Sequence, residues 1–158
     1  MSNKLSIGSK APDFVLRDQD GNGVHFADRI GKKTIVLYFY PKDFTGGCTQ
    51  EACAFRDSYE VFKDAGAEVI GVSADAPETH HAFAEQHRLP FTLLSDPGSK
   101  VAEAYGLSKK FGFIPARTTF VIDRDGVIRH MFESMVNMGA HIDEAKKIVL
   151  ELEQEAVK

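Results

Sequence analysis

The sequence of 158 residues predicts an α/β fold in which a central mixed β-sheet is flanked by helices. Short β-branched and aromatic runs alternate with segments of helical periodicity through the first two thirds of the chain. Two further strand patterns then meet at a tight turn, and an amphipathic helical pattern follows them. Such an order is typical of a mixed sheet with helices on both faces. The length predicts one domain over residues 1–158.

An N-terminal β-hairpin is the first expected element. Residues 13–17 and 24–26 have strand character and flank the sequence Asp20-Gly21-Asn22-Gly23. Asp-Gly and Asn-Gly pairs are strong hairpin signals, because these residue types tolerate the backbone conformations that two-residue turns require.

The alternating part of the fold begins at residues 34–40, a continuous β-branched and aromatic run that is typical of a strand buried on both faces. The elements expected from here to residue 95 are a strand over 34–40, a helix over 48–63, a strand over 68–73, a helix from about Pro77 to His87, and a strand over 91–95. Pro41 stops the first strand, and Gly66 marks the end of the first helix. These elements make a β-α-β-α-β series.

The last third of the chain predicts a short helix over residues 98–105, a hairpin and a C-terminal helix. The hairpin strands, residues 117–123 and 127–133, are joined by Arg124-Asp125-Gly126. Apolar residues recur at helical spacing in the last segment, at Ile142, Ala145, Val149, Leu152 and Ala156. This stripe is expected to face the core.

Composition excludes several classes of protein. The formal charge is -4, and no run of basic residues supports a nucleic-acid surface. The longest strongly apolar stretch, residues 35–40, is far shorter than the roughly 20 residues that cross a bilayer, so no membrane partner is expected. The first fourteen residues contain no continuous apolar segment of the kind found in secretory signals. A cytoplasmic location is therefore the expectation.

The two cysteines, Cys48 and Cys53, are the most informative feature of the sequence. They are too few for a disulfide framework, and they lie within six residues of each other. Cys48 falls in the first turn of a predicted helix, where unpaired backbone N–H groups and the helix dipole favour an anion such as a thiolate. The alternative interpretation is that Cys48 is a small buried hydrophobic residue.

Helical geometry separates the two thiols. The stripe of Cys48 also contains Ala52, Phe55, Tyr59 and Phe62, whereas that of Cys53 contains Asp57, Glu60 and Asp64. Cys48 is expected to face the core, and Cys53 the polar side, where it could also be an incidental surface residue. Their Cα atoms are about 8 to 9 Å apart in an intact helix. A disulfide reaches less than about 7 Å, so one between them would require the first turns of the helix to unwind.

Residues 38–53, YFYPKDFTGGCTQEAC, resemble the active-site segment of the peroxiredoxins, in the branch called Q-type or bacterioferritin comigratory protein. Further matching segments lie at residues 8–14, 80–83, 89–96 and 114–120, so the resemblance covers nearly the whole chain. It implies a thioredoxin-like fold and a thiol peroxidase for hydrogen peroxide and organic hydroperoxides that needs no metal or other cofactor. Because this branch is mostly monomeric, a monomer is expected.

The resemblance also implies a role for individual residues. The family motif Pro-x-x-x-Thr-x-x-Cys falls on Pro41, Thr45 and Cys48, and the distant family arginine falls on Arg117. The Cys48 thiolate would attack the terminal peroxide oxygen, and Arg117 would stabilise the thiolate and the developing charge. The Thr45 hydroxyl and the N–H groups of Gly47 and Cys48 would hold the peroxide oxygens. Pro41 would shape the loop and shield the site from water.

Three more positions complete the comparison with the family. Gly46 replaces the usual proline after the motif threonine and is expected to loosen the loop. Glu51 matches a carboxylate that orients the arginine, although an interaction with the helix dipole explains it equally well. Cys53 sits where many members carry their resolving cysteine, which would attack the Cys48 sulfenic acid to give an intramolecular disulfide. Thioredoxin or a similar dithiol would then reduce this disulfide.

Two other functional classes fit the sequence less well. A general thiol–disulfide oxidoreductase uses Cys-x-x-Cys, whereas four residues separate Cys48 from Cys53. A non-enzymatic redox or metal-binding adaptor on the same fold leaves Thr45 and Arg117 unexplained. The histidines of the second predicted helix, His80, His81 and His87, show no recognisable ligand set, so they are interpreted as structural or surface residues and no metal is expected.

Overall fold

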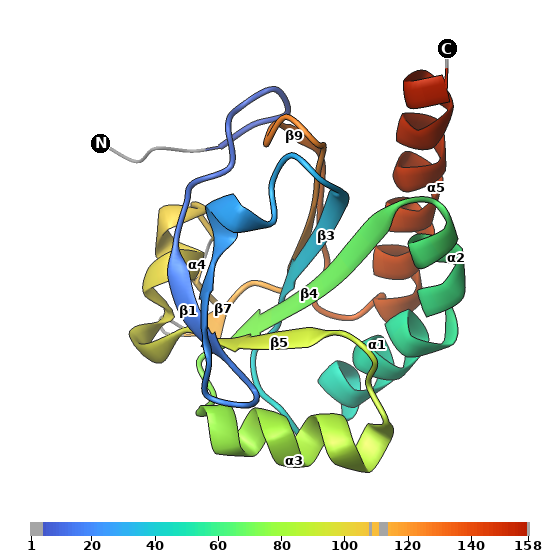
Figure 1. The fold of residues 1–158 in the computed structure, drawn as a ribbon. Coiled ribbons are helices and arrows are strands. Elements are labelled where there is room, and N and C mark those ends of the chain that lie inside the picture. The colour runs from blue at the N-terminus through green and yellow to red at the C-terminus, as the bar shows by residue number, and fades with distance from the viewer. Residues whose placement is uncertain (1–4, 108, 111–113, 158) are drawn as a thin grey trace.

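A computed structural model describes residues 5–107, 109–110 and 114–157 (Figure 1). Seven strands form one sheet in the order β2-β1-β5-β4-β3-β8-β9. Their bounds are Val15–Asp18 (β1), Gly23–His25 (β2), Thr34–Phe39 (β3), Ala67–Ser73 (β4), Thr92–Ser95 (β5), Thr118–Ile122 (β8) and Ile128–Glu133 (β9). Strand β4 pairs in parallel with β3 and β5, and the other neighbours pair antiparallel. The predicted mixed sheet and both hairpins are confirmed.

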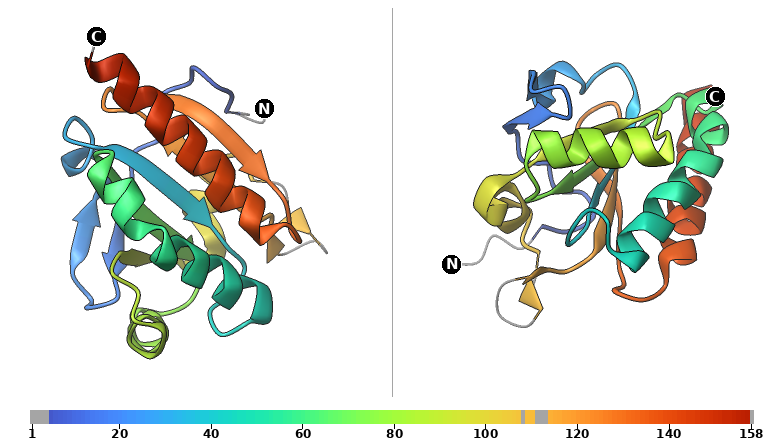
Figure 2. Two further views of the ribbon diagram at one scale, coloured as in Figure 1. Left: turned by 90° about the vertical axis from the view of Figure 1, so that its right-hand side faces the viewer. Right: turned by 90° about the horizontal axis from the view of Figure 1, so that it is seen from below.

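Helices cover both faces of this sheet. They are α1 (Gly46–Asp57), α2 (Tyr59–Asp64), α3 (Pro77–His87), α4 (Lys100–Ala104) and α5 (Met138–Val157), with short 3-10 turns η1 (Phe26–Asp28) and η2 (Pro97–Ser99). Helices α1, α2 and α5 lie together on one side of the sheet, and α4 lies on the other (Figures 1 and 2). A separate two-stranded pair, β6 (Lys109–Lys110) and β7 (Ile114–Pro115), was not predicted.

Strand β3 lies inside the sheet, between β4 and β8. All six of its residues are buried. Ile35, Leu37 and Phe39 face the core beneath η1 and α4, and Val36 and Tyr38 face the core beneath α1, α2 and α5. Full burial of each large side chain contributes about 1.5–3 kcal/mol to folding. This strand therefore fixes the point at which the chain leaves the sheet and enters the loop before α1.

The helix predicted over residues 48–63 is two helices. The backbone of Ser58 leaves the helical region (φ -99°, ψ 4°) and separates α1 from α2. Serine favours such a position because its hydroxyl competes for local backbone groups and weakens a helix interior. Both cysteines belong to α1, so their helix can change conformation without a continuous connection to α2.

The C-terminal helix agrees with its predicted stripe, since Ile142, Ala145, Val149 and Leu152 are buried. The side chain of Ala156, the last predicted member, lies outside the described residues. None of the helices in the described part of the chain is both long and apolar enough to cross a membrane.

Candidate active site

Cys48 is the third residue of α1 and is almost completely buried, with 1% of its surface exposed. The chain passes from β3 through residues 40–45, and Thr45 is the N-cap of the helix. The first intrahelical bond runs from the Thr49 N–H to the Thr45 carbonyl. Cys48 therefore lies in the first turn, where N–H groups lack partners within the helix and a thiolate is stabilised.

Arg117 reaches this cysteine from the residue before β8. Its side chain is buried, and its Nη1 donates to Glu51 Oε1 at 2.7 Å. Burial alone would lower the pKa of the guanidinium, but attraction to Glu51 and Cys48, and hydrogen bonds to both, raise the pKa above its ordinary value. The fold thus brings together two residues that are far apart in the sequence and that the resemblance placed in one site.

Glu51 is completely buried one turn after Cys48. Burial raises the pKa of its carboxyl to about 7, although the Arg117 charge acts in the opposite direction. Because α1 begins at Gly46, Glu51 lies outside the first turn. Its ion pair with Arg117 supports a role in orienting the arginine, and its place in the helix does not support a role at the dipole.

His141 of α5 borders the same carboxylate and was missed in the sequence. Its Nδ1 is 3.6 Å from Glu51 Oε2, its Nε2 donates to the Ser134 carbonyl at 2.8 Å, and Nδ1 accepts from the Thr119 hydroxyl at 2.7 Å. Burial lowers the pKa of His141, which favours this neutral tautomer. The available signal was its spacing from Ala145, which places a polar residue on the apolar stripe.

Gly47 allows the arginine to lie against the start of α1. A Cβ atom at this position would stand 2.8 Å from Met138 Cε and 3.0 Å from Arg117 Nη2, closer than side chains normally pack. At the adjacent Gly46, a Cβ would meet nothing within 4 Å. The two glycines therefore have different roles: Gly47 makes room for the guanidinium, and Gly46 does not.

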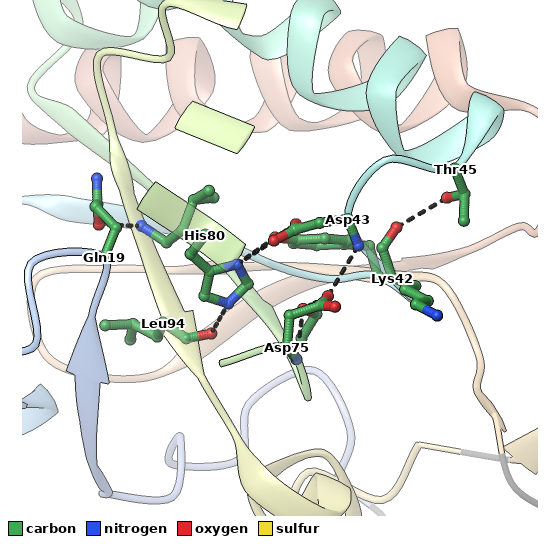
Figure 3. Close-up of polar contacts among 10 residues, drawn as sticks. Gln19, Lys42, Asp43, Thr45, Asp75, His80 and Leu94 are labelled. Carbon is green, nitrogen blue, oxygen red and sulfur yellow. Dashed lines mark hydrogen bonds and ion pairs between the residues drawn. The ribbon is translucent and has the colours of Figure 1, made fainter. Parts of the chain in front are cut away.

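Thr45 is exposed, and its hydroxyl does not cap the helix. It donates instead to the Lys42 carbonyl at 2.8 Å (Figure 3). This bond engages the hydroxyl proton and leaves the oxygen lone pairs available to accept a hydrogen bond. Pro41, at the other end of the same loop, is half-buried.

A polar network of largely buried side chains holds the loop between β3 and α1 (Figure 3). The Asp43 N–H donates to Asp75 Oδ2 at 2.8 Å, and Asp43 Oδ2 lies 2.6 Å from His80 Nδ1. The sequence shows no recognisable ligand set around His80, whereas the fold places two carboxylates beside it. The three residues could in principle hold a metal ion. Both ring nitrogens of His80 are, however, already engaged with the protein.

Cys53 is half-buried, whereas the helical stripe predicted the polar side of the helix. Its Sγ lies 3.8 Å from Nδ1 of His87, near the end of α3. The Arg56 guanidinium donates to the carbonyl of the same histidine at 2.7 Å. Both cysteines are free thiols in an intact helix, so this is the conformation in which Cys48 and Cys53 cannot reach each other.

This chain is similar to known proteins of one family. The model of the AhpC/TSA family matches residues 7–131. A chloroplastic peroxiredoxin Q from Triticum aestivum is 51% identical over 150 residues, which is 94% of this chain and 69% of that protein. The corresponding protein of Sedum lineare is 49% identical over 150 residues, covering 94% and 80%.

Solved structures show the same relationship. The crystal structure of peroxidoxin BcpB from Mycobacterium tuberculosis has a TM-score of 0.85 and 36% identity, over 92% of this chain and 96% of that one. A structure of the bacterioferritin comigratory protein of Xanthomonas campestris, described in terms of alkyl peroxide reduction, has a TM-score of 0.84 and 26% identity, covering 94% and 98%.

Proposed function

This chain belongs to the AhpC/TSA family and is a peroxiredoxin with a thioredoxin-like fold, and on that premise we propose that Cys48 is the nucleophile of a thiol-dependent peroxidase. The observation that carries the proposal is the burial of Cys48 in the first turn of α1, with the Arg117 guanidinium bonded to it. A thiolate in this position has two sources of stabilisation that a merely structural cysteine does not need.

In the first step, the Cys48 thiolate attacks the terminal oxygen of the hydroperoxide. A sulfur–oxygen bond forms and the oxygen–oxygen bond breaks, which gives Cys48 sulfenic acid and, after protonation, water or an alcohol. Arg117 stabilises the negative charge that develops on the leaving oxygen. The N–H groups of Gly47 and Cys48 donate to the peroxide, and the Thr45 oxygen accepts its proton in a hydrogen bond.

In the second step, Cys53 attacks the sulfenic sulfur and releases water, which gives a Cys48–Cys53 disulfide. Helix α1 has to open first, because the two Cα atoms are about 8 to 9 Å apart while it is intact. Thioredoxin or a similar dithiol then reduces the disulfide and returns both thiols. The break at Ser58 supports this step, since the opening can be confined to α1.

The test is peroxide consumption by reduced protein in the presence of a chelator. The wild type should consume about one equivalent of hydrogen peroxide before any reductant is added, and should turn over when thioredoxin and its reductase are supplied. Cys48→Ser should consume none, and Cys53→Ser should give the single burst without efficient turnover. A protein that exchanges disulfides but shows no burst would instead be a general thiol–disulfide oxidoreductase.

The cell compartment and the assembly state belong to the same proposal. We expect a cytoplasmic monomer, although the plant relatives are named as chloroplastic proteins. Sedimentation of the reduced and oxidised protein, and localisation of the tagged chain in its own cells, test these two expectations.

A further inference from the structure

We propose that His80 is a positioning residue of the peroxidase site, which in its doubly protonated form clamps Asp43 and so holds the loop that presents Thr45 and the first turn of α1. The proposal rests on the function proposed for Cys48. His80 lies on α3, touches none of the groups that would contact the peroxide, and acts through the loop.

The loop between β3 and α1 is attached to the rest of the fold through Asp43. The backbone N–H of this residue donates to Asp75 Oδ2, which also accepts from the Ser73 hydroxyl at 2.6 Å. Its carboxylate accepts from the Tyr40 hydroxyl at 2.6 Å and contacts His80 Nδ1 at 2.6 Å (Figure 3). Asp43 and His80 are both buried, so little water competes for these bonds.

The geometry places a proton on the contact between Asp43 and His80. His80 Nε2 is 2.9 Å from the Leu94 carbonyl, which can only accept, so Nε2 carries a hydrogen. Nδ1 faces a carboxylate oxygen, and that carboxylate already accepts from Tyr40, whose own pKa is raised well above its ordinary value by burial. A neutral ring with its hydrogen on Nε2 would bring the lone pair of Nδ1 to 2.6 Å from Asp43 Oδ2, so that two lone pairs would face each other.

The surroundings of the ring suit a donor at each nitrogen. Two carboxylates, from Asp43 in the loop and Asp75 at the end of β4, have oxygens within 4.8 Å of the ring nitrogen and of each other. The other polar groups that face the ring are the Tyr40 hydroxyl, 3.4 Å from Nδ1, and the Leu94 carbonyl of β5. A buried ring that carries a charge beside two carboxylates attracts both, whereas a neutral ring would leave them to repel each other.

The loop needs such an anchor because its backbone is strained. Phe44, the residue after Asp43, has φ +64°, a conformation that is uncommon for a bulky side chain. Strained conformations persist only where the surrounding structure determines them. Phe44 is held by Phe83, whose ring meets it edge to face at 5.1 Å, and Phe83 lies one turn from His80 on α3. His80 and Phe83, one turn apart on α3, therefore hold the consecutive loop residues Asp43 and Phe44.

Two steps of the reaction should respond in opposite directions when the clamp is lost. Peroxide attack requires the closed loop and the intact first turn of α1, so it should slow. Disulfide formation requires the same turn to open, so it should accelerate. The protein should consequently tolerate more peroxide before Cys48 is overoxidised.

Two substitutions at the same position separate the clamp from the rest of the side chain. His80→Gln can keep a donor near the position of Nε2, facing Leu94, and removes the donor to Asp43. His80→Asn can keep a donor near the position of Nδ1, facing Asp43, and removes the bond to Leu94. We expect the rate constant of Cys48 with hydrogen peroxide to fall about tenfold in His80→Gln and to stay within about threefold in His80→Asn.

A double-mutant cycle tests whether His80 acts through Asp43. Asp43→Asn should slow peroxide attack about as much as His80→Gln does, and the double variant should be no slower than either one, because both remove the same contact. Slowing that multiplies in the double variant, or a His80→Asn variant as slow as His80→Gln, would overturn the proposal. Disulfide formation after the burst must be faster in His80→Gln, and an unchanged or slower rate also overturns it.

The unmodified protein gives an independent readout should the variants fold poorly. Nitrogen-15 resonances of His80 in the reduced wild type should show a hydrogen on Nδ1 as well as on Nε2. A ring with only Nε2 protonated would contradict the clamp. This measurement needs no turnover, so absence of a peroxide burst in the wild type would count against the proposed function and would be distinguished from a failure of the clamp itself.

Discussion

The Arg117 guanidinium donates to the Glu51 carboxylate at 2.7 Å, and both side chains are buried behind Cys48. The same guanidinium is hydrogen-bonded to Cys48. An ionised Glu51 partly neutralises the positive charge of Arg117, so the charge on Glu51 determines how strongly the guanidinium attracts the thiolate and the peroxide. Because the pKa of Glu51 is about 7, this balance changes near neutral pH.

The first prediction concerns the pH dependence of stability. The ordinary pKa of Glu51 is 4.5, and the folded protein raises it to about 7, so between these values the unfolded chain releases a proton that the folded chain retains. The free energy of unfolding should therefore fall as pH rises from 4.5 to 7 and then level off. The contribution of this one group is about 3 kcal/mol.

Glu51→Gln is the matched control for this effect. Glutamine keeps an oxygen that accepts from Arg117 but cannot ionise, so the fall between pH 4.5 and 7 should be shallower than in the wild type. Urea unfolding at a series of pH values gives the difference between the two curves. Parallel curves would show that Glu51 does not titrate in this range in the folded protein.

A second prediction compares the two glycines before Cys48. Gly47→Ala forces a Cβ against Met138 Cε and Arg117 Nη2, so the ends of both side chains have to shift. In Gly47→Ala the rate constant of Cys48 with peroxide should fall about tenfold or more, since small displacements of a positioned group slow a reaction strongly. Gly46→Ala adds the same methyl group into open space and should leave the rate unchanged. Stopped-flow measurement of the burst should separate them; equal rates would contradict the packing.

The departure from the family at Gly46 leads to a third prediction. Gly46 is the first residue of α1, a position that suits proline, and Thr45 before it has the extended backbone (φ -88°, ψ 154°) that proline requires of its predecessor. Gly46→Pro should therefore stabilise the reduced protein by about 0.4–1 kcal/mol, by restricting the unfolded chain. A lower thermal midpoint would show that the loop depends on the freedom of Gly46.

Much of this fold was predictable because its strands are buried on both faces. The residues of β3, β4 and β5 are almost all buried, and short β-branched and apolar runs bounded by turn residues identify such strands well. The break at Ser58 was not predictable, because the apolar stripe continues through it from Phe55 to Phe62.

The site divides in the same way. Cys48, Thr45 and Arg117 were predicted for the site through a motif that resembles a family, and helical spacing alone predicted that Cys48 faces the core, where it is buried. The contacts of His80 with Asp43, and of His141 with Glu51, join segments that are distant in the sequence. Pairings of that kind depend on how β3, α3 and α5 pack, which no local pattern records.

The last prediction concerns the conformational change of α1 on oxidation. In the reduced protein the helix runs from Gly46 to Asp57, with Phe55 fully buried and stacked on Tyr38 at 4.6 Å between ring centroids. Amide hydrogens over residues 50–56 should therefore exchange slowly. In the disulfide form they should exchange fast, because joining the two sulfurs requires the turns between them to unwind.

Helix α2 provides the internal control, because the break at Ser58 separates it from the unwinding segment. Protection in α2, which Phe62 anchors in the core, should survive oxidation. Cys53→Ser treated with one equivalent of peroxide should keep the protection of α1, since its sulfenic acid has no partner within the chain. Equal protection of α1 in the reduced and disulfide forms would show that the helix does not open, and Cys53 could then not resolve Cys48.

Unwinding that exposes Phe55 removes about 1.5–3 kcal/mol of stabilisation that its burial gives the reduced protein. The disulfide form is less stable by that amount, which makes the disulfide more oxidising and favours its reduction by a dithiol.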